Sequence, residues 1–124
     1  MGAINVTAED FRTTIEDHDI VLFDWWASWC GPCRMFAPVF EKAAAAHPDI
    51  TFAKVDTEAE SGLAGAMDIR SIPTLMVFRE GVLVFSQPGA LPSGALEELI
   101  AKVRQLDMAQ VHRAAATQAA PAAR

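Results

Sequence analysis

Cys30 and Cys33 are the feature that most constrains how this chain can fold. They are the only cysteines in its 124 residues, and they follow an apolar run, Ile20 to Ala27, and precede a helix-like segment from about Arg34 to His47. A spacing of i and i+3 puts both sulfurs on one side of a first helical turn, with Cβ atoms about 5 to 6 Å apart. Slight fraying of that turn brings them within bonding range. A reversible disulfide is therefore geometrically possible.

Redox chemistry explains this cysteine pair better than stabilisation does. A disulfide that closes a four-residue loop constrains the unfolded chain by only about 2 kcal/mol. If Pro32 and Cys33 begin a helix, Cys30 lies at the helix N-terminus, where unpaired N–H groups and the helix dipole favour a thiolate. We expect Cys30 to be exposed, reactive and a good leaving group. We expect Cys33, one turn into the helix, to be shielded and to resolve a mixed disulfide.

The hydrophobic pattern predicts an α/β domain of residues 1–106, followed by an Ala-rich extension of residues 107–124. A hydrophobic fraction of 52% is ample for one core. For the extension we favour a solvated, partly helical or disordered tail over a docking segment. The expected strands are 4–6, 20–27, 51–56, 75–78 and 82–85, and the expected helices are 7–17, 34–47, 58–67 and 92–106.

Three local signals refine these predictions. Thr7 and Asp10 resemble a capping box that opens the first helix at Thr7. Pro38 is expected to kink the second helix. Residues 79–81 form a short polar segment that ends in glycine and separates two apolar runs. This pattern predicts a hairpin turn, so the last two strands are expected to be antiparallel.

Asp24 interrupts the apolar run of the second strand, which is expected to be covered on both faces. A carboxylate there is costly unless it is paired or protonated, and desolvation raises its pKa. One reading is a bulge or a satisfied polar group in the core. The other is a functional acid.

The segment Phe23-Asp24-Trp25-Trp26-Ala27-Ser28-Trp29-Cys30-Gly31-Pro32-Cys33-Arg34-Met35-Phe36-Ala37-Pro38 resembles the active-site segment of the thioredoxin family. The resemblance continues in 53–56, 69–75 and 89–91 and spans about residues 4 to 106. Two positions depart from the family pattern, because Asp68 stands where the family usually has Gly and Pro88 where it often has Val.

The resemblance implies a thioredoxin fold, with a single-layer central mixed β-sheet of four to five strands flanked by helices on both faces. It implies a general protein-disulfide reductase that works by dithiol–disulfide exchange through a redox-active Cys30–Cys33 disulfide, with no other cofactor. Asp24 is then the acid/base for Cys33, with Lys54 as its partner. The Gly-Pro pair between the cysteines is similar to that of the reducing branch of the family.

The resemblance also implies a substrate-binding rim. Ile72–Pro73 is expected to be a cis peptide whose ring lies against the sulfurs, leaving the Ile72 backbone free to pair with an extended substrate. Without the resemblance, a trans proline that begins a strand is the simpler interpretation. Gly89 would allow a partner's backbone to approach closely. The expected substrate-binding residues are Trp29, Gly31, Pro32, Ile72, Pro73 and Gly89.

The expected partners are disulfide-bearing proteins and an NADPH-dependent thioredoxin reductase. A formal net charge of −6 argues against nucleic acid, and no basic run suggests a membrane surface. Tetrahedral zinc needs four ligands, and the three histidines lack suitable spacing, so no metal site is predicted. We found no signal for export and expect a cytoplasmic monomer. Two alternatives remain: a more oxidising disulfide oxidant or isomerase, and a binding or chaperone-like module with dispensable redox activity.

Overall fold

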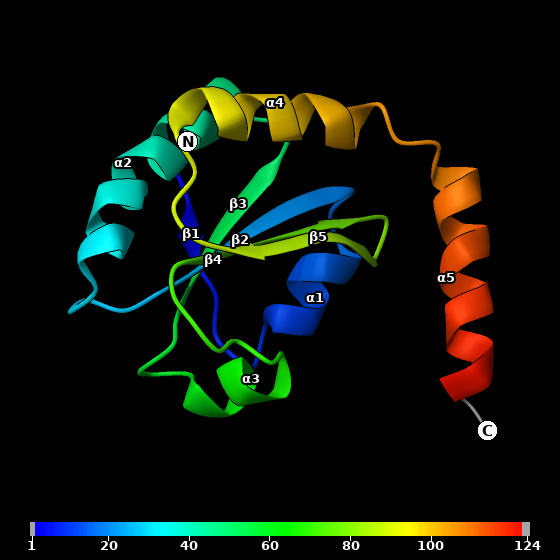
Figure 1. Ribbon diagram of the computed structural model, residues 1–124, viewed down its shortest axis with the longest axis horizontal. Helices are drawn as coiled ribbons and strands as arrows, with labels where there is room; N and C mark the ends of the chain where they lie inside the picture. The colour runs from blue at the N-terminus through cyan, green and yellow to red at the C-terminus, as the bar shows by residue number, and fades with distance from the viewer. Residues whose placement is uncertain (1, 123–124) are drawn as a thin grey trace.

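A five-stranded mixed sheet in the order β1-β3-β2-β4-β5 forms the centre of the molecule (Figure 1). The computed structural model describes the backbone of residues 2–122 and the side chains of residues 2–117. The strands are β1 Ile4–Asn5, β2 Ile20–Trp26, β3 Thr51–Asp56, β4 Thr74–Arg79 and β5 Val82–Pro88. β3 is parallel to β1 and β2, whereas β4 is antiparallel to β2 and β5. The predicted mixed sheet is confirmed.

Helices cover both faces of this sheet (Figure 1). They are α1 Phe11–Glu16, α2 Gly31–Ala46, α3 Ser61–Ala66, α4 Ser93–Arg104 and α5 Met108–Ala122. Successive side chains of a strand point to opposite faces, so Leu22 packs with α2 and α4, whereas Phe23 packs with residues of α1 and α3. By the same alternation Asp24 lies on the α2 face, the face on which Cys33 also lies.

The first helix begins later than predicted. Residues 8–10 form a turn, and α1 starts at Phe11. The Thr7 N–H donates to Asp10 Oδ1 at 2.7 Å, which is one half of a capping box, but the Thr7 hydroxyl donates to the same oxygen at 3.1 Å, and the Asp10 N–H donates to the Thr7 carbonyl at 3.2 Å. These bonds close the turn that precedes the helix. The predicted start at Thr7 is therefore wrong.

Other predicted boundaries also change. α2 begins at Gly31 and not near Arg34, and β4 spans Thr74–Arg79 and not 75–78. Residues 57–60 form a turn before α3, in which the Glu58 N–H donates to Asp56 Oδ1 at 2.9 Å, so the helix starts at Ser61 and not at Glu58. β5 continues past Phe85 to Pro88, because its pairing with β4 extends to Thr74.

The extension beyond residue 106 forms α5 as far as Ala122, while Ala123 and Arg124 of the predicted tail lie outside the described residues. α5 lies beside β5, with Met108 buried and Val111 half-buried. His112 Nε2 lies 2.8 Å from Glu80 Oε1, next to the β4–β5 turn. Within residues 2–122, none of the helices combines the length and apolar character that a membrane crossing requires.

Candidate active site

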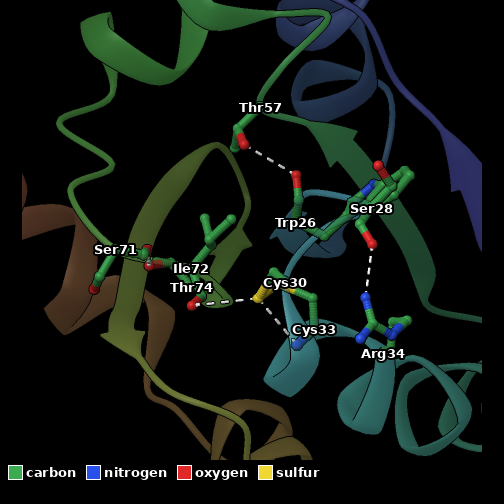
Figure 2. Close-up of a disulfide and its surroundings, with 9 residues drawn as sticks. All are labelled: Trp26, Ser28, Cys30, Cys33, Arg34, Thr57, Ser71, Ile72 and Thr74. Atoms are coloured by element: carbon green, nitrogen blue, oxygen red, sulfur yellow. Dashed lines mark hydrogen bonds between the residues drawn. A yellow bond between two sulfur atoms is a disulfide. The ribbon is translucent and has the colours of Figure 1, made fainter.

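The end of the central strand delivers the cysteine pair to the start of α2. All of β2 except its last residue is buried. The Trp26 carbonyl accepts hydrogen bonds from the Thr57 N–H at 2.9 Å and the Thr57 hydroxyl at 3.0 Å, which fixes the strand end (Figure 2). The Cys30 N–H then donates to the Ala27 carbonyl at 3.2 Å. This turn places Cys30 at the N-cap of α2.

Cys30 and Cys33 form a disulfide whose Cα atoms are 5.2 Å apart. Figure 2 shows the pair in the first turn of α2. Cys30 Sγ accepts the Cys33 N–H at 3.2 Å, in the place where a serine or aspartate would cap the helix. A sulfur that already accepts a backbone N–H at a helix N-terminus is stabilised as an anion. The geometry thus favours a thiolate at Cys30 when the bond is reduced.

The predicted difference in exposure between the two sulfurs is wrong for this structure. Cys30 is 4% exposed and Cys33 is 3% exposed. Cys30 packs with Ala27 and Ile72, which cover it. The two residues differ in their surroundings instead, because Cys30 faces Ile72 whereas Cys33 lines a cavity beside Lys54.

The Ile72–Pro73 segment forms the wall opposite the disulfide. The peptide bond between these residues is cis, as predicted. The Ile72 carbonyl oxygen lies 3.7 Å from Cys30 Sγ (Figure 2). A reduced Cys30 thiol can donate to that oxygen, whereas the disulfide carries no proton to donate. The Ile72 carbonyl thus lies directly beside Cys30 Sγ.

Gly89, which directly follows β5, supports this wall. Its N–H donates to the Pro73 carbonyl at 2.7 Å, and its φ of 108° is a conformation that side-chain-bearing residues rarely adopt. The structure therefore places Gly89 directly behind the cis-proline.

Asp24 is fully buried in β2, with neither carboxylate oxygen hydrogen-bonded to another described residue. Its burial raises its pKa from 3.8 to about 7, although the charge of Lys54 lowers it in part. The reading of Asp24 as a satisfied polar group is therefore wrong. Its carboxyl can hold or release a proton near neutral pH, which is the range a proton-transfer group needs.

Lys54 is the register partner of Asp24 on β3. Its Nζ lies 5.1 Å from the centroid of the Trp26 ring, within range of a cation–π interaction, and it forms no direct hydrogen bond with Asp24. Lys54 and Cys33 both line a cavity of about 260 Å³, whose wall consists of Trp26, Ala27, Ser28, Cys33, Arg34, Ala37 and Lys54. This cavity offers water a route to the Cys33 side of the disulfide.

The outer rim is apolar and open. Trp29 is 65% exposed, Pro32 is exposed and Gly31 is partly exposed. An exposed indole beside a reactive sulfur provides apolar area for a docking protein.

Arg34 is a site residue that the sequence did not single out. Its Nη1 donates to the Ser28 carbonyl at 2.9 Å, so the side chain links the first turn of α2 to the segment before Cys30 (Figure 2). The only available signal was its position directly after Cys33. Among residues 2–122, no three side chains of histidine, cysteine, aspartate or glutamate come together as metal ligands.

Comparison with known proteins extends these observations. The family model Thioredoxin matches residues 2–102. The chain is 54% identical over 121 residues to the protein named "Putative thioredoxin 2" of Streptomyces coelicolor, covering 98% of this chain and 90% of that protein. It is 42% identical over 103 residues to thioredoxin 1 of a Nostoc species, covering 82% of this chain and 96% of that one. The match to the Streptomyces protein thus includes the α5 segment, which lies outside the family model.

Solved structures show the same architecture. A mutant thioredoxin from Halobacterium salinarum superposes with a TM-score of 0.74 at 36% identity, covering 80% of this chain and 88% of that one. The oxidised mitochondrial thioredoxin 3 of Saccharomyces cerevisiae also gives 0.74, at 32% identity, covering 81% of this chain and 94% of that one.

The fold, the capped disulfide and these likenesses agree with one another. The chain belongs to the thioredoxin family, and it is a thiol–disulfide oxidoreductase that carries out dithiol–disulfide exchange through Cys30 and Cys33.

Proposed function

We propose that this protein is a general reductant of protein disulfides, in which Cys30 attacks and Cys33 resolves. The observation that carries this assignment is the Cys33 N–H donating to Cys30 Sγ at the start of α2. A thiolate held there is the attacking group of the first step. The reducing direction is supported by the Gly31-Pro32 pair, which is similar to that of the reducing branch of the family.

The proposed reaction consumes one substrate disulfide and leaves one disulfide in this protein. The Cys30 thiolate attacks one substrate sulfur, and the other sulfur leaves as a thiolate that takes up a proton. The Cys33 thiol then loses its proton and attacks Cys30 Sγ, which releases the second substrate thiolate. Two electrons pass to the substrate, and the Cys30–Cys33 disulfide is formed.

Asp24 is proposed to take the Cys33 proton. It lies on the same face of the sheet as Cys33, it is unpaired, and its pKa is raised to about 7. Lys54 would favour its charged form, since the Lys54 charge opposes that rise. The cavity shared by Cys33 and Lys54 would hold the water through which the proton moves.

Substrate is proposed to lie along Ile72 and Pro73 and to contact the rim of Trp29, Gly31 and Pro32. Gly89 would support Pro73 from behind, consistent with its 2.7 Å hydrogen bond to the Pro73 carbonyl. We further propose that an NADPH-dependent thioredoxin reductase restores the dithiol, and that the protein acts as a cytoplasmic monomer.

Insulin-disulfide reduction with thioredoxin reductase and NADPH tests this function. We expect wild-type protein to turn over, Cys30→Ser to be inactive, and Cys33→Ser to accumulate a mixed disulfide through Cys30. The reduction potential is expected near the value of about −270 mV known for thioredoxin. A value near the −180 mV or so of protein disulfide isomerase would instead identify an isomerase. Full biological activity of a Cys30→Ser, Cys33→Ser double variant would identify a binding module.

A further inference from the structure

Asp68 and Arg70 form an ion pair immediately before the substrate wall. Arg70 Nε donates to Asp68 Oδ1 at 2.8 Å. Both side chains are largely exposed, at 84% for Arg70 and 73% for Asp68. Exposed pairs of this kind contribute little to folding stability. The pair can therefore matter more for the electrostatic interaction with a substrate than for folding stability.

The conformation of Asp68 makes the pair unusual. Its φ is 60°, in the left-handed region, where glycine is favoured and aspartate is tolerated better than most residues. Glycine would satisfy this backbone more easily. The carboxylate thus stands at a position whose backbone conformation favours glycine.

Arg70 lies close along the chain to the substrate wall. It stands two residues before Ile72, so their Cα atoms are separated by at most about 7.6 Å. The Ile72 carbonyl in turn lies 3.7 Å from Cys30 Sγ. A substrate chain extended along Ile72 therefore passes within about 10 Å of the Arg70 backbone, well inside the Debye length of about 30 Å at 10 mM salt.

We propose that Asp68 is a specificity-determining residue. Its ion pair with Arg70 masks the positive charge beside Ile72 and so reduces the binding of disulfides that are flanked by acidic residues. This inference rests on the proposed function, because it requires substrates to lie along Ile72. The masking adds to the repulsion that a chain of net charge −6 already exerts on acidic partners.

Kinetics with two matched peptide disulfides test this inference. One peptide carries glutamates beside its disulfide, and the other carries glutamines at the same positions. Asp68→Asn keeps a residue that tolerates positive φ and removes only the charge. At about 10 mM salt, where the Debye length is about 30 Å, we expect the variant to lower KM for the acidic peptide about threefold relative to the neutral one, with kcat unchanged. The difference should vanish near 1 M salt.

A double-variant cycle shows whether Arg70 is the group that is masked. In an Arg70→Met background, Asp68→Asn is expected to change the ratio of the two KM values by clearly less than in the wild-type background, because only the direct repulsion by the Asp68 carboxylate then remains. An equal shift in that background would mean that Asp68 repels substrate directly, and would overturn the inference. So would equal KM ratios in wild type and Asp68→Asn.

Asp17→Asn is the matched control for net charge. Asp17 lies at the end of α1, just before β2 begins. The disulfide follows the other end of β2, so the two lie at opposite ends of that strand. The same KM shift in this variant would show a general charge effect and would also overturn the inference. A wild-type protein that reduces neither peptide would contradict the proposed function instead, so the two failures are distinguishable.

Discussion

At the scale of single residues, Asp24 links stability to pH. Its pKa in the folded protein is about 7, against 3.8 for an ordinary aspartate, because of burial. A raised folded-state pKa gives stability that is fully present below about pH 4 and is lost as pH rises through about 7. Asp24→Asn cannot ionise at this position, so we expect it to remove this loss. Between pH 4 and pH 8 the free energy of unfolding of wild type should fall by about 2 to 4 kcal/mol more than that of the variant.

Urea unfolding of the oxidised protein at pH 4 and pH 8 measures this effect. Asp17→Asn, on the exposed end of α1, serves as the control and is expected to keep the wild-type dependence. A pH dependence that persists in Asp24→Asn would show that another group causes it.

Asp24→Asn is also predicted to slow the resolving step, in which Cys33 attacks the mixed disulfide. Without a carboxylate to take its proton, Cys33 must lose that proton to water, so release of reduced substrate is expected to slow about tenfold or more at pH 7. The defect should shrink at pH 9, where the thiol ionises unaided. Single-turnover reduction of a peptide disulfide at both pH values measures it. An equal defect at both would argue against a role in proton transfer.

The sequence predicted the Cys30–Cys33 disulfide and the cis Ile72–Pro73 bond, but not the burial of Cys30. These residues and Asp24 were singled out because the CxxC spacing, a charge in an apolar strand and the family resemblance are all local patterns. The low exposure of Cys30 was not predictable in this way, because Ile72, 42 residues further on, covers it. Contacts of this kind exist only once the chain has folded.

At the scale of helices and strands, Arg79 is the clearest example of a residue without a local signal. It ends β4, and its Nη1 donates to the Val103 carbonyl at 2.7 Å and to the Arg104 and Leu106 carbonyls at 3.3 Å. These carbonyl groups lie in the last turn of α4 and just beyond it, where a helix leaves most carbonyls without intrahelical partners; the Val103 carbonyl also accepts the Leu106 N–H at 3.3 Å. A cation there also opposes the negative end of the helix dipole.

Arg79→Met is predicted to destabilise the protein by about 1 to 3 kcal/mol, because two partly buried carbonyls and one exposed carbonyl lose a charged donor. Arg12→Met, on the exposed surface of α1, is the matched control and is expected to change stability by less than about 0.5 kcal/mol. Urea unfolding of both variants measures the difference. Equal midpoints would mean that water replaces the guanidinium at no cost.

The helix boundaries show where sequence patterns stop being informative. Strand β2 and helices α2 and α4 were found where their apolar spacing is long and regular. The predicted start of α1 was wrong, because the Thr7–Asp10 pattern forms only half of a capping box, around a turn of residues 8–10 that precedes the helix. The same residues at the same spacing can close either a turn or a first helical turn, so only the fold distinguishes the two.

At the scale of the whole molecule, α2 and α5 lie on opposite sides (Figure 1). The disulfide begins α2 at one side of the sheet, whereas α5 lies beside the edge strand β5 at the other. A groove of about 250 Å³ remains between α5 and β5. It is lined by Val82, Leu83, Val84, Leu106, Val111, Ala114 and Ala115. α5 is therefore loosely packed, and none of the proposed substrate-binding residues belongs to it.

Deletion of residues 108–124 is accordingly predicted to leave kcat/KM for insulin reduction within about twofold of wild type. Its cost should appear in stability instead, since it removes the buried Met108 and half-buried Val111 and uncovers part of β5. Loss of that apolar burial corresponds to about 2 to 4 kcal/mol. Insulin turnover and urea unfolding, measured on the same preparations, separate the two effects. A large loss of turnover by a deletion variant that remains folded would mean that α5 acts on substrate, so that the catalytic unit extends beyond residue 106.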